Sequence, residues 1–338
     1  MDNSSPRNAR TVVVGGGTMG ADVAVVLARG GAQVTVVDPH AARRDHVLPH
    51  IAQELAAAGQ ATHAGPVQVC ASLQDVDWSG VVLVVECITE QLAAKQKLFA
   101  ELEAVAPLNA VLASNSSGFP ISAIAHGLAT AQRMLGLHFF MPAHLVPLVE
   151  VVLGERSDPA LGTWLHAFMR GCGSVPVLVK KDKPGFLANR MQHALSREAF
   201  ALIDEGIASP EDVDAAVRFG FGFRFLAAGP VLQRDHAGIE VHTAAAATMY
   251  PTLSNTDVPA QALRDKVAQG TLGMKTGKGF FDWPDDRKQA ERARYDALLR
   301  QGLAPLAREL PPIPPPTATS SPAPPPPPRP PRARVGPS

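Results

Sequence analysis

Two polar residues in apolar surroundings could together remove a proton from a substrate hydroxyl. His138 ends one apolar run, and Glu150 lies inside another. An ionised carboxylate among apolar residues is costly unless it is paired, and an imidazole is the economical partner. Histidine titrates near neutral pH and is a frequent general base. We therefore predict a His138–Glu150 pair in which the carboxylate fixes the tautomer of the ring.

Ser117 and Asn189 could complete such a site. Ser117 belongs to the Ser-Asn-Ser-Ser-Gly run 114–118, which follows an expected strand at the edge where open α/β sheets bind ligands. Asn189 comes just after the Lys-Pro-Gly-Phe sequence 183–186. Taken singly, the serine run is typical of a helix cap, and the asparagine of a solvent-exposed helix position. As a group with the His–Glu pair, they could polarise substrate oxygens.

A glycine-rich turn predicts that the chain binds a dinucleotide. Residues 15–20 read Gly-Gly-Gly-Thr-Met-Gly, after a β-branched run and before an expected apolar helix over residues 21–29, and we expect Thr18 and Met19 to bind the cofactor with the glycines. Gly15 permits a tight turn, Gly17 lets the backbone approach a pyrophosphate, and Gly20 lets helix and strand pack closely. The free N–H groups of the helix start attract phosphate.

Asp38 indicates which dinucleotide this is. It ends the second expected strand, eighteen residues after Gly20, where a carboxylate can accept both ribose hydroxyls. It would repel a 2′-phosphate, so we predict NAD, although Arg43 and Arg44 lie nearby. With NAD as hydride acceptor, His138 would take the hydroxyl proton as hydride leaves the same carbon.

The hydrophobic pattern predicts an α/β fold, a Rossmann-type doubly wound, mostly parallel sheet followed by an all-α C-terminal domain. Continuous Val/Leu runs suit strands that helices cover on both faces, and they alternate with helical stretches. The expected strands are residues 11–14, 34–37, 81–85, 110–113, 134–138, 149–152 and 175–179. After Pro184 apolar residues recur at helical spacing.

These patterns divide the chain into three parts. Residues 1–182 form the expected NAD-binding Rossmann domain, and residues 183–310 a helical domain for dimerisation or substrate binding. Residues 311–338 contain fourteen of the thirty-one prolines, which lock φ and remove backbone donors. We therefore expect a disordered tail there.

Composition excludes several classes of protein. Thirty-one Lys and Arg balance thirty-one Asp and Glu, which argues against a nucleic-acid partner. No uncharged apolar run is long enough to span a bilayer, and the start is not a secretory signal. The three cysteines, Cys70, Cys87 and Cys172, have no metal-ligand spacing. We expect reduced thiols in a cytoplasmic protein, a small-molecule substrate and no metal.

Seven motifs, in the same order, resemble the L-3-hydroxyacyl-CoA dehydrogenase family. They are residues 15–20, 114–117, 136–140, 147–152, 181–190, 229–238 and 273–281. The resemblance implies that His138 is the general base, that Glu150 is its partner, and that Ser117 and Asn189 contact the reacting oxygens. It also implies that Asp38, Glu90 and Lys95 line the NAD site and that the helical domain forms a homodimer.

Two departures from the family pattern concern the substrate. Met141 stands where the family commonly has Asn, and residues 40–79 contain no lysine, whereas acyl-CoA members often have a lysine-rich helical hairpin there for the CoA phosphates. The resemblance puts an L-3-hydroxyacyl-CoA, such as 3-hydroxybutyryl-CoA, first. One alternative is a free 3-hydroxy acid, as in carnitine, gulonate and pyridine-carboxylate dehydrogenases, and another is a crystallin-like NAD-binding protein that is not an enzyme.

Overall fold

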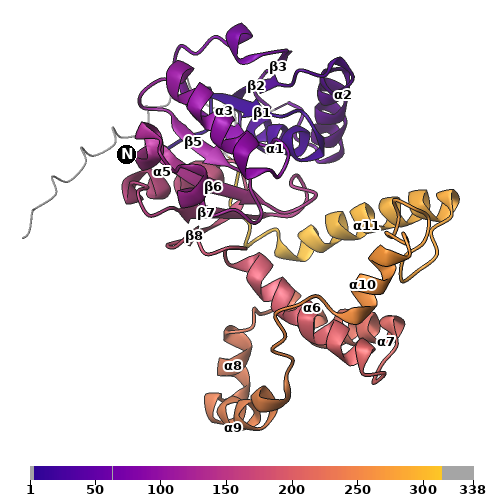
Figure 1. Cartoon of the computed structure of the whole chain (residues 1–338). Coiled ribbons are helices and arrows are strands. Elements are labelled where there is room, and N and C mark those ends of the chain that lie inside the picture. The colour runs from indigo at the N-terminus through magenta and orange to yellow at the C-terminus, as the bar shows by residue number, and fades with distance from the viewer. Residues whose placement is uncertain (1–3, 63, 314–338) are drawn as a thin grey trace, which may run out of the picture. The chain divides into compact units, whose positions relative to one another are not determined.

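A computed structural model describes residues 4–62 and 64–313 of the chain (Figure 1). It divides into two units. The first contains the residues up to Asn189 and those from Glu309 onward, and the second is Arg190–Arg308. Each unit is described by itself below.

The first unit is built on one eight-stranded sheet of order β3-β2-β1-β4-β5-β6-β7-β8. The strands are β1 (Arg10–Val14), β2 (Gln33–Val37), β3 (Val67–Cys70), β4 (Val81–Glu86), β5 (Val111–Ser114), β6 (Met134–Phe139), β7 (Leu148–Leu153) and β8 (Val175–Val179). Neighbouring strands are parallel except β6 and β7, which pair antiparallel. The predicted Rossmann-type, mostly parallel sheet is confirmed.

Helices cover both faces of this sheet because its strands are apolar on both sides (Figure 1). In β1, Val13 points into one core, whereas Val12 and Val14 belong to the other, as the two-residue period of a strand requires. The first core includes residues of α1 (Thr18–Arg29), α2 (Ala41–Ala57) and α5 (Pro159–Gly171). The second includes residues of α3 (Leu92–Val105) and α4 (Ile121–Ile124).

The sequence analysis missed β3. This strand has four residues, lies at the edge of the sheet, and has no buried side chain. It therefore lacks the apolar run that marks the central strands. As a result, β6 and β7 are the sixth and seventh strands of the chain.

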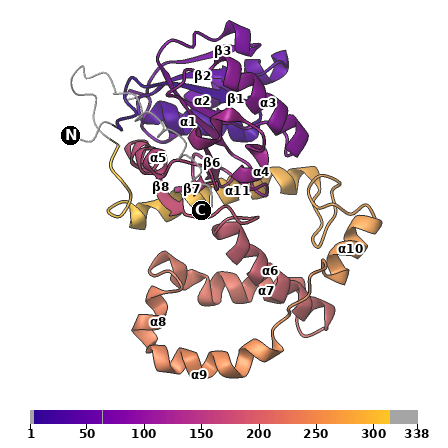
Figure 2. The same cartoon turned by 60° about the vertical axis from the view of Figure 1, so that its left-hand side comes forward.

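The second unit consists of helices, as predicted (Figure 2). They are α6 (Ala188–Asp204), whose first two residues still belong to the first unit, α7 (Pro210–Ala215), α8 (Leu232–Ala237), α9 (Ile239–Met249), α10 (Gln261–Ala268) and α11 (Asp285–Leu306). None of the described residues in these helices is buried within the single chain.

The boundaries between the parts differ from the expected ones. The first unit extends beyond residue 182 to Asn189, since hydrogen bonds tie this segment to the sheet domain, as described below. At the other end, Pro311 is buried and Ile313 lies beside Gly173. The first residues of the expected tail are thus packed, and its remainder, 314–338, lies outside the described residues.

Two smaller expectations concern membranes and thiols. Within residues 4–62 and 64–313, no helix combines the length and the apolar character that crossing a bilayer needs. Cys70, Cys87 and Cys172 are all free thiols, and burial raises the pKa of Cys172 to about 12.

Candidate active site

The antiparallel pairing of β6 and β7 places His138 directly opposite Glu150. His138 Nδ1 lies 2.7 Å from Glu150 Oε2. The His138 side chain is 3% exposed and that of Glu150 is fully buried. A carboxylate only accepts hydrogen bonds, so Nδ1 carries the proton and donates it. The structure therefore contains the pair that the sequence predicted.

The second carboxylate oxygen of Glu150 holds the chain segment that leads into α6. Its Oε1 accepts the backbone N–H groups of Leu187 at 3.0 Å and Ala188 at 2.8 Å. Burial raises the pKa of Glu150, but the hydrogen bonds from His138, Ala188 and Leu187 and the charge of His138 outweigh it and lower the pKa below its usual value. Glu150 is thus held as an anion beside the imidazole.

A cavity of about 340 Å³ opens beside His138 at the ends of the strands. Among the described residues, Nε2 of His138 makes no hydrogen bond, so this nitrogen is left for a ligand. The lining residues are Met19, Cys87, Ile88, Glu90, Asn115, Ser117, His138, Phe139, Phe140, Met141 and Asn189. The cavity therefore joins the predicted base to Ser117, Asn189 and the start of α1.

Glu90 organises the loop that contains Ser117. Its Oε1 accepts the Ser116 hydroxyl at 2.6 Å and the backbone N–H groups of Ser117 and Gly118, each at 3.1 Å. The Ser117 carbonyl in turn lies 3.4 Å from Asn189 Nδ2. The Ser117 hydroxyl is thereby carried on a loop with a fixed backbone, at the wall of the cavity.

Lys95 acts behind this loop rather than in the cavity. Its side chain is 1% exposed, and Nζ lies 2.7 Å from Glu86 Oε1 and 3.2 Å from Glu90 Oε2. Lys95 is absent from the lining residues, so it reaches the cavity only through Glu90. Burial raises the pKa of Glu90, but the Ser116 hydrogen bond, Lys95 and the Gly118 N–H lower it below the usual value.

The sequence analysis did not single out Asn115 or Glu86. Asn115 lines the cavity, and its Oδ1 accepts the N–H of Phe139, the residue after His138. Glu86 is fully buried at the end of β4 and accepts the Ser114 hydroxyl at 2.7 Å. A signal existed for Glu86, because a charged residue closing an apolar strand needs a partner. No such signal distinguished Asn115, because it stands within the four consecutive polar residues 114–117.

The glycine turn has the properties that a dinucleotide site needs. A Cβ added to Gly17 would meet nothing within 4 Å, whereas one at Gly20 would lie 1.7 Å from the Gly15 carbonyl oxygen. Gly15 has φ +105°, which favours glycine. No side chain caps the start of α1, and its first turn contains no acid. The turn therefore leaves open space and free N–H groups, and it fits a pyrophosphate.

Asp38 lies at the end of β2, next to this turn. Its Oδ2 accepts the Gly16 N–H and its Oδ1 accepts the His40 N–H, each at 2.8 Å. Arg43 Nη1 lies 3.4 Å from Oδ2, and Arg44 donates to the Asp38 carbonyl. A carboxylate has further lone pairs, so these contacts leave it able to accept ribose hydroxyls. The side chains of Arg43 and Arg44 thus both lie beside Asp38 at the end of β2.

Comparison with known proteins decides the family. Residues 10–183 match the NAD-binding domain of 3-hydroxyacyl-CoA dehydrogenase, and residues 185–283 match its C-terminal domain. The chain belongs to the 3-hydroxyacyl-CoA dehydrogenase family. Like its relatives it is an NAD-dependent oxidoreductase, and NAD supplies the hydride acceptor when bound.

Relatives in this family differ in substrate. A 5-formyl-3-hydroxy-2-methylpyridine 4-carboxylate 5-dehydrogenase of Mesorhizobium japonicum is 34% identical over 86% of this chain and 96% of its own length. A solved structure of an enzyme of that activity, described as an NAD⁺-dependent dismutase, has a TM-score of 0.82 at 31% identity, with 86% and 96% coverage. A 3-hydroxybutyryl-CoA dehydrogenase of Mycobacterium tuberculosis is 33% identical over 81% of this chain and 98% of its own.

Proposed function

We propose that this member of the family oxidises a small free hydroxy acid, or the hydrate of an aldehyde acid, with NAD. In this proposal Nε2 of His138 takes the hydroxyl proton while Glu150 stabilises the resulting imidazolium. Ser117 and Asn189 position the oxygen of the reacting carbon, and Gly17, Thr18 and Met19 receive the cofactor phosphates. Asp38 accepts the ribose hydroxyls.

The observation that carries the choice of a free acid is the structure of residues 40–79. Their described part forms the helix α2, the edge strand β3 and a short 3₁₀ helix (Leu73–Asp75), and the stretch contains no lysine. Arg43 and Arg44 both contact Asp38, and His50 contacts Asp22. A phosphate-rich CoA handle needs cations, and this stretch commits its arginines to the edge where the NAD ribose is expected.

This proposal reverses the order given by the sequence resemblance, which put a CoA thioester first. The relative from Mesorhizobium, whose name contains a free pyridine carboxylate, supports the free acid. The TM-score of 0.82 with the solved structure of an enzyme of that activity also supports it. The CoA thioester stays the second candidate because the Mycobacterium relative is named for 3-hydroxybutyryl-CoA.

A matched substrate panel tests the choice. The purified chain is assayed by NADH absorbance with acetoacetate and acetoacetyl-CoA, and with NAD and a formyl pyridine carboxylate. We expect kcat/KM for a free acid to exceed that for the thioester by at least about tenfold, or 1.4 kcal/mol. A preference for the thioester overturns the proposal, and NAD binding without any turnover favours the crystallin-like alternative.

We also propose that two copies associate through the second unit. Its described residues include large exposed apolar side chains, among them Phe219 at 74% and Phe223 at 66% in the short helical segments 216–221 and 223–226, and apolar surface on this scale is typical of an interface. Light scattering should give the mass of a dimer for the wild type. Phe223→Asp should shift it toward a monomer, whereas Leu108→Asp, at an 85% exposed position of the first unit, should not.

A further inference from the structure

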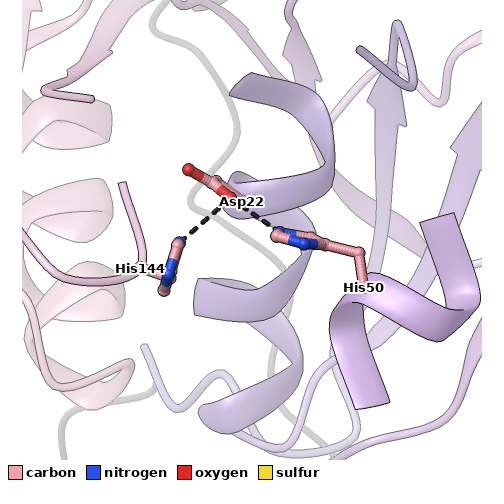
Figure 3. Close-up of side chains that lie close together, drawn as sticks. All are labelled: Asp22, His50 and His144. Carbon is pink, nitrogen blue, oxygen red and sulfur yellow. Dashed lines mark hydrogen bonds and ion pairs between the residues drawn. The ribbon is translucent and has the colours of Figure 1, made fainter. Parts of the chain in front are cut away.

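A second cluster of polar side chains lies away from the lining of the cavity, between α1, α2 and the loop that joins β6 to β7. Asp22 Oδ1 lies 2.8 Å from His50 Nε2 and 3.0 Å from His144 Nδ1 (Figure 3). These three ligand atoms all lie within 4.8 Å of one another. Asp22 comes from α1, His50 from α2 and His144 from the loop.

The cluster is sheltered from solvent. The side chains of Asp22, His144 and His50 are 2%, 9% and 19% exposed. On its other nitrogen, His144 Nε2 lies 3.1 Å from Glu54 Oε2. A ring that donates Nε2–H to Glu54 presents an unprotonated Nδ1 to Asp22, unless it is doubly protonated. Within the described residues, this buried Nδ1 has no hydrogen bond of good geometry.

The charges of the cluster do not balance when both imidazoles are neutral. Asp22 and Glu54 bring two negative charges into a buried site, and burying unpaired charge is costly. Arg29 is the nearby cation, and because its guanidinium donates to the neutral carbonyls of His144 and Cys172, its single positive charge offsets at most one of the two carboxylates. The remaining negative charge calls either for a protonated imidazole or for a cation bound between neutral rings.

We propose that Asp22, His50 and His144 bind one divalent transition-metal ion, with Zn²⁺ as the best match. Two imidazoles and a carboxylate form a ligand set that zinc prefers, at ligand distances of about 2.0–2.2 Å. A water molecule would complete a tetrahedral site of three protein ligands. The ion would supply the positive charge that a protonated imidazole would otherwise provide.

Glu54 is the positioning residue of this site. Metal-binding histidines usually donate their second N–H to a carboxylate, which fixes the tautomer and the direction of the ring. The His144–Glu54 contact has this arrangement and turns Nδ1 toward Asp22. Asp22 keeps its own orientation because its Oδ2 accepts the Ala143 N–H at 3.0 Å.

The ion would have a structural task. It would join α1, whose first turn borders the nucleotide site, to α2 and to the loop that leaves β6 after His138. None of the three ligands lines the catalytic cavity. The metal therefore stabilises the scaffold around the site without touching the substrate. It would also overturn the expectation, drawn from the sequence, of no metal.

Calorimetric titration of the chelator-treated full chain with Zn²⁺ tests the proposal. We expect one ion per chain at neutral pH, with a higher Tm and release of up to about two protons, because the ligands must be deprotonated. His144→Gln should abolish this binding, and Glu54→Gln should weaken it by about 10–100-fold. His126→Gln, at an exposed turn, is the matched control and should bind as the wild type does.

Two results would contradict the site. One is wild-type protein that takes up no stoichiometric Zn²⁺, which would leave protonated imidazole as the balancing charge. The other is equal binding by the wild type and by His144→Gln. If that variant fails to fold, Co²⁺ added to the wild type decides, because a saturable visible spectrum of tetrahedral nitrogen–oxygen ligation is required at one ion per chain.

Discussion

His138 and Glu150 occupy directly opposed positions on two antiparallel strands, with Nδ1 and Oε2 2.7 Å apart. Because both side chains stand on strands inside a sheet, their separation depends on backbone pairing rather than on a loop. The carboxylate holds one ring nitrogen and leaves the other to the cavity. The first two predictions follow from this division.

Replacing His138 by glutamine should remove the proton acceptor without disturbing the nucleotide turn. We expect kcat to fall by about 10²–10⁴-fold, the usual effect of losing a general base. The Kd for NADH, measured by fluorescence, should stay unchanged. His126→Gln is the control at an exposed histidine. A variant at His138 with nearly full kcat would show that another group takes the proton.

Glu150→Gln should produce the wrong tautomer of His138. The single amide oxygen would accept the N–H groups of Leu187 and Ala188, and the NH₂ group would donate to Nδ1. Nε2 would then carry the proton and could not act as a base, so kcat should fall by about 10²–10⁴-fold. Glu155→Gln, at an exposed position, should have no such effect.

The same variant should change the acid stability. The pKa of folded Glu150 lies below its ordinary value of 4.5, so folding favours the ionised form. Its contribution to stability is present above about pH 4.5 and is lost as the pH falls through the lowered folded-state pKa. Urea unfolding between neutral and acidic pH should thus show a smaller loss of stability for Glu150→Gln than for the wild type.

Two glycines of the nucleotide turn should respond in opposite ways. Gly17→Ser adds a side chain in open space and a hydroxyl that caps the N–H groups of α1. It should retain the wild-type Tm but weaken NAD binding by about tenfold or more. Gly20→Ala would place its Cβ against the Gly15 carbonyl. This clash should lower the Tm of the variant below that of the wild type. Equal NAD affinity in Gly17→Ser and wild type would argue against phosphate binding there.

Asp38→Ser should change the choice of dinucleotide. It removes the carboxylate that faces Arg43 and would repel a 2′-phosphate. With Arg43 and Arg44 left at that edge, the ratio of kcat/KM for NADP to that for NAD should rise by about tenfold or more. Kinetics with both cofactors measure this ratio. An unchanged ratio would place the ribose elsewhere.

Lys95→Met should destabilise the fold, because it leaves Glu86 as a buried and uncompensated charge. Removal of one partner of a buried pair costs about 3–5 kcal/mol. Lys97→Met, on the same helix but 81% exposed, should cost no more than about 0.5 kcal/mol. Urea unfolding of the two variants gives the difference. Similar free energies of unfolding for the two variants would mean that the charge of Lys95 is not needed to compensate the charge of Glu86.

Much of the first unit could be predicted from its strands. The Val-rich strands are buried on both faces. Because burial on both faces excludes polar residues, these strands appear in the sequence as continuous apolar runs. The pairing of His138 with Glu150 followed from the cost of an isolated buried carboxylate. The antiparallel direction of β7 was also readable, since residues 140–147 are too few for a parallel crossover.

Other features depend on tertiary contacts that no local pattern reports. β3 is half exposed and short, so neither its composition nor its length marks it. The boundary after Asn189 depends on two backbone donors that happen to reach Glu150. The cluster around Asp22 unites residues 22, 50 and 144, and their spacing in sequence follows no metal-ligand motif.

The two carboxylate oxygens of Glu150 accept hydrogen bonds from different parts of the chain. One accepts from the imidazole of His138, and the other accepts from the backbone at the start of α6. If the segment around Leu187 withdrew its N–H groups, the carboxylate would become more basic and would draw the Nδ1 proton toward itself. The charge of the carboxylate that faces His138 thus depends on a stretch of main chain, and a side-chain substitution scan alone would overlook that control.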